Sequence, residues 1–219
     1  MPEEVPSPRR GGRPSKEEAG KLEDKILDAA AALFFGEGYG AASIEQIAKN
    51  AQISKRTFYA RFENKAALFS AVVRRVIQRV RPADGAATDK LFLGDNIEEI
   101  LRRIAPVILH GALSPEAVAL HRVVQAEAAR FPELALIVDK QGARQEAIKR
   151  IAALLRDEAI REKRALADPV FAAEHFLLML TAGPQRRAMG LGVPMTSPEL
   201  HEWAMKTVDL FLNGYRGRD

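Results

Sequence analysis

The sequence predicts an all-α protein with a small three-helix unit at its N-terminal end and a larger helical region after it. Apolar residues recur at intervals of three and four in each periodic stretch, and no stretch shows the sustained alternation with β-branched residues that is typical of strands. Two late segments, Asp168-Pro169 and Ser197-Pro198, each place proline directly after a helix-capping residue. With 47% apolar residues, a chain of 219 residues can fill a hydrophobic core.

The first helix is predicted to follow a disordered basic arm. Residues 1–16 are rich in Pro, Gly and Arg and contain almost nothing apolar, so they cannot bury enough surface to order themselves. From Leu22 the apolar residues form one stripe at helical spacing. This helix is expected to stop at the three glycines Gly36, Gly38 and Gly40.

Two short helices with clear start signals should follow. Ser43, with Gln46 three residues later, forms a capping-box pattern for a helix that runs to about Asn50. Ser54 can cap the next helix, and Ile53 before it can pack on Phe58. Such a close pair of short helices is typical of a helix-turn-helix.

The remaining helices are read from the same periodicity. The sequence predicts a helix from about Asn64 to Val80, then a loop or domain boundary over Pro82–Gly94. Five further helices are predicted, over Ile97–Leu109, over Pro115–Arg130, over Gly142–Arg161, after Asp168 and after Ser197.

The helix after Ser54 has the two faces that a DNA recognition helix needs. Phe58 and Phe62 point inward with Ile53 and fix the helix on its neighbours. The outward side chains are those of Arg56, Thr57, Tyr59 and Ala60, with Lys55 at the flank of the N-terminal end. This outward set contains no acid and suits bases and phosphates in a major groove. An ordinary amphipathic surface helix is the alternative.

The positive charge is concentrated in the same part of the chain. The net charge is +4, and residues 41–80 contain eight Lys and Arg against two Asp and Glu. Residues 81–219 contain nineteen of each kind. A segment that faces phosphates has this imbalance, although a solvated basic face would have it too.

The run over residues 26–69 resembles the DNA-binding domain of the tetracycline-repressor (TetR) family. The residues that carry the resemblance are those from Ser43 to Ala48 and from Ser54 to Lys65. Residues 121–134 resemble the C-terminal domain of the AefR-like branch of that family. The resemblance implies a helix-turn-helix DNA-binding domain over 17–64 and a helical ligand-binding and dimerisation domain over 65–219.

The same resemblance implies a set of DNA contacts. It places Ser43 and Tyr59 on phosphates, and it places Lys65 at the start of a helix against the DNA backbone. It places Lys55, Arg56 and Thr57 at the base edges, with Ser54 at the same helix end. Arginine can grip guanine with two hydrogen bonds, and hydroxyl groups suit phosphate oxygens. The arginines of the basic arm, placed by the resemblance where relatives enter the minor groove, are Arg9, Arg10 and Arg13.

One position departs from the family pattern. Relatives usually have glycine in the turn between the two helices, where this chain has Gln52. A left-handed backbone there costs a residue with a Cβ about 1 kcal/mol. The fold tolerates such a cost, so the expected consequence is limited to the geometry of the turn.

The C-terminal region is expected to sense a small molecule and to form a homodimer. His121 and Gln125 share a helix face, and His175 lies in a helix that is apolar almost all round, so each is a candidate ligand contact. A core histidine bonded to a carbonyl or to water is the competing interpretation. The predicted dimer interface consists of Phe176, Leu180, Trp203, Val208, Phe211 and Leu212.

The sequence therefore predicts a repressor that an unidentified small-molecule effector releases from a palindromic operator in double-stranded DNA. Two alternatives stay open: an architectural DNA-binding dimer without a ligand, and a helical protein-interaction module. There is no cysteine, and no Gly-rich phosphate loop, metal-spaced histidine cluster or activated nucleophile occurs, so we predict no enzyme activity, metal or cofactor. Without a signal-peptide core or a membrane-spanning run, a cytoplasmic protein with no membrane partner is expected.

Overall fold

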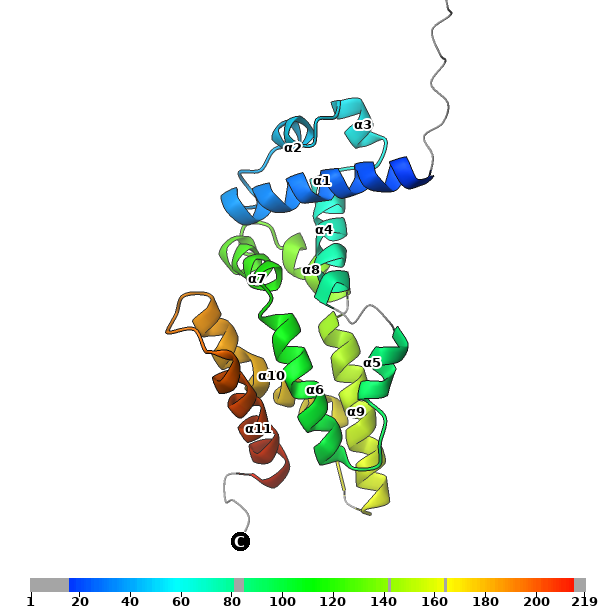
Figure 1. Cartoon of the computed structure of the whole chain (residues 1–219), viewed down its shortest axis with the longest axis vertical. Coiled ribbons are helices and arrows are strands. Elements are labelled where there is room, and N and C mark those ends of the chain that lie inside the picture. Colours follow the sequence, from blue (N-terminus) through cyan, green and yellow to red (C-terminus); the bar gives the residue numbers. More distant parts are fainter. Residues whose placement is uncertain (1–15, 81–84, 142, 164, 215–219) are drawn as a thin grey trace, which may run out of the picture.

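The computed structural model describes residues 16–80, 85–141, 143–163 and 165–214, and within these ranges the chain forms eleven α-helices and no strand (Figure 1). The helices are α1 (Lys16–Glu37), α2 (Ile44–Asn50), α3 (Lys55–Tyr59), α4 (Lys65–Val80), α5 (Gly85–Leu91), α6 (Ile97–Ala112), α7 (Pro115–Glu127), α8 (Glu133–Lys140), α9 (Ala143–Arg161), α10 (Pro169–Ala188) and α11 (Ser197–Asn213). Figure 1 shows α2 and α3 at one end of the elongated molecule, on the far side of α1 from α6 and α9–α11. The predicted arm lies outside the described residues, apart from its last residue, Lys16, which begins α1.

The caps predicted for α2 and α3 are present. The Ser43 hydroxyl accepts a hydrogen bond from the Gln46 amide at 3.2 Å, and the Gln46 side chain accepts one from the Ser43 amide at 3.0 Å. The Ser54 hydroxyl accepts from the Thr57 amide at 3.0 Å. Each bond satisfies a backbone group that a helix terminus leaves without a partner, so both short helices begin where the sequence predicts.

The turn between α2 and α3 has the backbone conformation that the family pattern implies. Gln52 has φ of 56°, in the left-handed region, and its side chain is exposed. The Ile53 amide donates to the Ala48 carbonyl at 2.9 Å, which closes the turn. The geometry is thus kept without glycine, at a cost of about 1 kcal/mol.

Two hydrophobic clusters divide the molecule. The first joins α1–α4 to α7 and α8, with Phe34, Phe69 and Leu134 fully buried in it. The second joins α6, α9, α10 and α11 around Leu101 and Phe176. The first cluster therefore extends past the predicted boundary at residue 64, since it includes two helices from the C-terminal half of the chain.

Three elements differ from the prediction. Helix α5 occupies part of the segment 82–94, where a loop was expected, and α8 was not predicted as a helix of its own. Both are short and are held by packing: Arg150 of α9 forms an ion pair with Asp89 of α5 at 2.7 Å, and Leu134 of α8 is fully buried. Helix α11 is capped by Thr196 rather than Ser197, because the Glu199 carboxylate accepts from the Thr196 amide at 2.7 Å.

Among the described residues, no single helix has both the length and the apolar composition needed to cross a membrane. Helices α6 and α7 pass that test only when they are joined across a bend of 65°.

Candidate nucleic-acid interface

Helix α3 is anchored by aromatic side chains on its inner face. Phe58 is fully buried and Phe62 is 8% exposed, and their ring centroids are 5.7 Å apart. Ile53 is partly buried against the same cluster. Phe62 lies three residues past the end of α3, where its amide donates to the Phe58 carbonyl at 3.0 Å, so the two rings together anchor the C-terminal end of α3.

The outer face of α3 is free of packing contacts for most of its length. Arg56 and Ala60 are exposed, and Tyr59 is 55% exposed with its ring edge against Phe58 at a centroid distance of 5.3 Å. A tyrosine held in this way presents its hydroxyl group to solvent while its ring stays fixed. Arg56 and Tyr59 are therefore available to a duplex that approaches α3.

Two other predicted contact residues on α3 already have partners within the helix-turn-helix. The Thr57 hydroxyl lies 2.9 Å from the Ser54 hydroxyl, and Thr57 is half-buried. Lys55 is exposed and forms an ion pair with Glu45 of α2. This hydrogen-bonded pair raises the pKa of Lys55 and lowers the pKa of Glu45.

Glu45 is a residue that the sequence reasoning missed. The outward face of α3 by itself contains no acid, as predicted, but α2 supplies one beside Lys55. Its carboxylate would repel nearby phosphates, and it holds the Lys55 ammonium on the protein. A base contact by Lys55 thus requires this ion pair to open.

The position of Lys65 corrects the expectation that its side chain faces DNA. Its ammonium donates to the carbonyls of Tyr39 at 2.8 Å and Ala42 at 3.1 Å, and it lies 4.5 Å from the centroid of the Tyr39 ring. Burial lowers the pKa of Lys65, against the opposing effect of the carboxylates of Glu127 and Glu133. The ammonium is therefore hydrogen-bonded to the segment between α1 and α2.

Ser43 lies at the C-terminal end of that segment and is half-buried. Its hydroxyl accepts from the Gln46 amide and still carries a proton to donate, so a phosphate oxygen can bind it without loss of the cap. Arg9, Arg10 and Arg13 lie outside the described residues.

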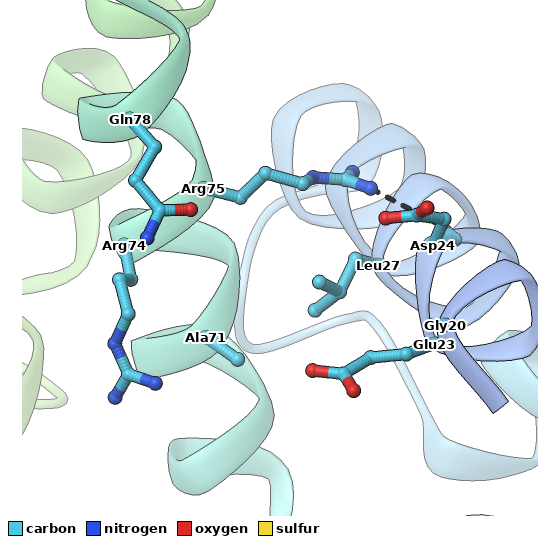
Figure 2. A pocket seen from close by; sticks show the side chains of 8 residues that line it. All are labelled: Gly20, Glu23, Asp24, Leu27, Ala71, Arg74, Arg75 and Gln78. Atoms are coloured by element: carbon cyan, nitrogen blue, oxygen red, sulfur yellow. Dashed lines mark hydrogen bonds between the residues drawn. The ribbon is translucent and has the colours of Figure 1, made fainter. Parts of the chain in front are cut away.

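A cleft between α1 and α4 lies below the helix-turn-helix (Figure 2). Its lining consists of Gly20, Glu23, Asp24, Leu27, Ala71, Arg74, Arg75 and Gln78. Arg75 spans it, donating to the Asp24 carbonyl at 3.1 Å and pairing with Asp28 at 2.8 Å. The charges of its two walls are thus partly matched within the protein, and the predicted ligand-contact residues lie elsewhere.

The three candidate ligand contacts are not brought together. His121 of α7 is half-buried, and burial lowers its pKa, whereas Gln125 is exposed. His175 of α10 is also exposed, although its helix was expected to bury it, and its Nδ1 lies 2.8 Å from the Phe171 carbonyl.

A contact beside His121 shows where α7 meets α10. Arg122 donates to the Ala188 carbonyl at 2.9 Å, so α7 meets α10 at its C-terminal end. His175 precedes Ala188 by thirteen residues, or about 20 Å of helix. The contact with α7 is therefore near the opposite end of α10 from His175.

Several residues predicted for the dimer interface belong instead to the core of one subunit. Phe176, Leu180 and Val208 are fully buried, because α10 and α11 pack on α6 and α9 as well as on each other. Trp203 is half-buried and donates from Nε1 to the Leu180 carbonyl at 2.9 Å. Phe211 and Leu212 are half-buried too. Because Phe176, Leu180 and Val208 are fully buried within the subunit, the predicted set as a whole does not form an exposed surface.

A different set of apolar residues is exposed on the same two helices. Val170 (47%), Phe171 (57%) and Leu178 (43%) are exposed on α10, and Leu210 (46%) is exposed on α11. Sequence periodicity correctly indicated that α10 is apolar on more than one side. It could not indicate which side faces the subunit's own core.

Two family models match the chain, one for each half. A model of bacterial regulatory proteins of the tetR family matches residues 26–72. A model of the C-terminal domain of AefR-like transcriptional repressors matches residues 99–217. The two segments together cover the helix-turn-helix and most of the helical remainder.

Solved structures and a sequence relative support the same assignment. A TetR-family transcriptional regulator from Mesorhizobium loti is 29% identical with a TM-score of 0.72, over 89% of this chain and 96% of that one. The flavonoid-responsive regulator FrrA is 30% identical with a TM-score of 0.67, over 88% and 96%. The transcriptional activator FasR from Mycolicibacterium smegmatis is 38% identical over 86 residues, and this match spans only 37% of each chain.

The fold and the exposed recognition helix define a helix-turn-helix DNA-binding regulator. The chain belongs to the TetR family of transcriptional regulators and has an AefR-like C-terminal domain. The predicted all-helical fold, the family and the DNA-binding class are thereby confirmed. Regulators of this family bind DNA as dimers and are not enzymes.

Proposed function

We propose that the protein is a one-component repressor that binds a palindromic operator as a homodimer and leaves it when a small molecule binds the C-terminal domain. The observation that carries the proposal is the geometry of α3. Its inner face is locked by Phe58 and Phe62, while Arg56 and Tyr59 project into solvent. This is the arrangement by which a recognition helix enters a major groove.

The predicted contacts on and beside α3 can be given separate roles. Arg56 reads a base edge, and Tyr59 and Ser43 bind phosphates on either side of it. Lys55 joins the base contacts once its ion pair with Glu45 opens, and Ser54 and Thr57 hold the helix end. The basic arm with Arg9, Arg10 and Arg13 adds minor-groove contacts.

The exposed apolar residues of α10 and α11 support a homodimer through these two helices. Val170, Phe171, Leu178 and Leu210 lie on helices that already pack together in one subunit. A two-fold axis through this surface would pair two helices from each subunit and remove all four side chains from water. The axis would also fix the distance between the two α3 helices.

We propose a small organic molecule as the effector, bound in the C-terminal domain, and a cytoplasmic location where the DNA is accessible. FrrA is described as flavonoid-responsive, which makes aromatic compounds of that size a reasonable first class to test. FasR is described as an activator, so the direction of regulation has to be measured alongside binding.

The test begins with selection of genomic fragments by the purified protein, followed by fluorescence anisotropy on the selected site. We expect a pseudopalindromic site and an affinity that falls steeply with salt, because several phosphates are neutralised in each subunit. A panel of aromatic and aliphatic compounds is then tested for release. Selection without any sequence preference would contradict operator binding, whereas preference without release by any effector would favour the architectural dimer.

A further inference from the structure

The segment between α1 and α2 is held from the C-terminal half of the chain by one carboxylate. Glu127, at the end of α7, accepts a hydrogen bond from the Tyr39 amide on Oε1 and one from the Gly40 amide on Oε2, both at 2.6 Å. Both oxygens of the side chain are thus used on two successive backbone amides. Hydrogen bonds to an ionised acceptor are about twice as strong as neutral ones.

Two glycines make room for this carboxylate. A Cβ at Gly38, where φ is +94°, would lie 2.5 Å from Glu127 Oε1. A Cβ at Gly40 would lie 2.8 Å from Oε2 and 3.0 Å from the ring of Phe131. These glycines were predicted only to end the first helix, but the structure shows that they also allow α7 to approach the backbone.

A residue of α4 binds the carbonyl groups of the same segment. Lys65 donates to the Tyr39 and Ala42 carbonyls. The Glu127 carboxylate of α7 thus binds the amides of this short segment, and the Lys65 ammonium of α4 binds its carbonyls. The Tyr39 ring, 3% exposed, packs edge-on against Phe69 at 5.3 Å and Phe131 at 5.2 Å. Burial, reinforced by the carboxylates of Glu133 and Glu127, raises the pKa of Tyr39 to about 12.

This stretch leads directly into the helix-turn-helix. Ala42 is followed by Ser43, the cap of α2, and α2 packs on α3. Helix α7 in turn contacts the C-terminal end of α10, since Arg122 donates to the Ala188 carbonyl. Helix α7 therefore contacts both the C-terminal end of α10 and the segment that precedes α2.

We propose that Glu127 is a positioning residue for operator binding: its carboxylate fixes the segment Gly38–Ala42, and the place of α7 thereby sets the place of the helix-turn-helix. The inference rests on the operator binding proposed above. It adds a specific contact through which the C-terminal half of the chain acts on α2 and α3. Both Glu127 oxygens are used on backbone amides, and a carboxylate repels phosphates, so the proposed role involves no direct DNA contact.

The test compares Glu127→Ala and Glu127→Gln with Glu116→Ala as a matched control. Glu116 is on the same helix, and its ion pair with Arg79 is long, at 3.8 Å, and exposed, so it contributes little to stability. We expect Glu127→Ala to weaken operator affinity about tenfold and to leave the slope of log affinity against log salt unchanged, because no phosphate contact is lost. Glu116→Ala should retain the wild-type affinity.

Amide hydrogen exchange without DNA tests the contact itself. The amides of Tyr39 and Gly40 should exchange faster in Glu127→Ala, while those of α9 and α10 stay protected. Glu127→Gln keeps the side-chain volume and one acceptor oxygen, so it should fold if the alanine variant does not and should show the same changes to a smaller extent.

A double-mutant cycle separates positioning from a general loss of stability. Gly40→Ala pushes on the Glu127 carboxylate at 2.8 Å and on the Phe131 ring at 3.0 Å, so it should weaken affinity in the wild type and less in the Glu127→Ala background, where only the ring contact remains. Additive effects would overturn the proposal, and so would faster exchange at Tyr39 and Gly40 with unchanged operator affinity. A wild-type protein without operator preference would overturn the proposed function and this inference together, whereas preference retained in Glu127→Ala at wild-type affinity would overturn only the inference.

Discussion

Helices α1–α4 and the pair α10 and α11 differ in how completely they bury their large side chains. Among the residues of α1–α4 whose burial is described, Tyr59 is the one large hydrophobic side chain that is exposed. Helices α10 and α11 together leave four exposed, namely Val170, Phe171, Leu178 and Leu210. The DNA-reading end is thus complete within one subunit, while the opposite end has apolar surface that a second subunit would cover.

The clusters also differ in composition. The first contains interlocked aromatic rings, with Phe34, Tyr39 and Phe69 in mutual contact at centroid distances of 5.3–5.5 Å. The second is mainly aliphatic, and its ring pair is Phe176 with Phe211 at 5.1 Å. Large rigid rings suit a unit whose side chains must hold a fixed orientation.

The largest expected effect concerns the first cluster. Phe58→Ala removes a fully buried ring and should lower the free energy of unfolding by about 3 to 5 kcal/mol. Urea titration followed by circular dichroism measures this loss. Tyr59→Ala is the control on the same helix, because its ring is 55% exposed and should cost much less. Equal losses in the two variants would show that α3 is not anchored as described.

The second prediction addresses the surface of α10. Phe171→Arg places a guanidinium in the proposed interface, which should destabilise the dimer by several kcal/mol while the subunit stays folded. Light scattering should report a monomer, and circular dichroism should report unchanged helicity. Leu136→Arg, at a residue of α8 that is 59% exposed, is the control and should remain dimeric. A dimeric Phe171→Arg variant would move the interface elsewhere.

A smaller effect is expected on the recognition face. Arg56→Ala should cost about 1 to 3 kcal/mol of operator binding and relax the preference at one base in each half-site. Competition binding with single-base operator variants measures both quantities. Arg144→Ala removes an exposed arginine from α9 and should change neither. Retention of the full preference by Arg56→Ala would place the base contact on another residue.

The smallest effect is expected at the turn. Gln52→Gly relieves a left-handed backbone at φ of 56° and should raise the free energy of unfolding by up to about 1 kcal/mol, reduced by the greater freedom of glycine in the unfolded chain. The urea midpoint should therefore rise slightly and operator affinity should stay the same. A lower midpoint would show that the Gln52 side chain stabilises the turn.

The local features of the fold could be predicted because they depend on neighbouring residues. The caps at Ser43, Ser54 and Asp168 are hydrogen bonds to amides three residues away, and each is present. The inward pair Phe58 and Phe62 follows from helix periodicity in the same way. Such contacts involve groups that the sequence places close together in any helix.

Most of the missing features depend on residues far apart in the chain, although the cap of α11 at Thr196 is local, since Glu199 is three residues away. Glu127 meets Tyr39 across 88 positions, and no pattern in either segment indicates the other. The burial of Phe176 inside one subunit depends likewise on where α6 and α9 pack. A period identifies an apolar face, but only tertiary packing decides whether that face meets the same chain or a second copy.

In the proposed complex, two subunits present two α3 helices to one operator. Hydroxyl-radical footprinting of the wild-type protein on a selected genomic site can show this arrangement. Two symmetric protected segments are expected, with centres about 34 to 36 Å apart, or a multiple of that distance, on the same face of the duplex. A single protected segment, or protection without any sequence preference, would contradict it.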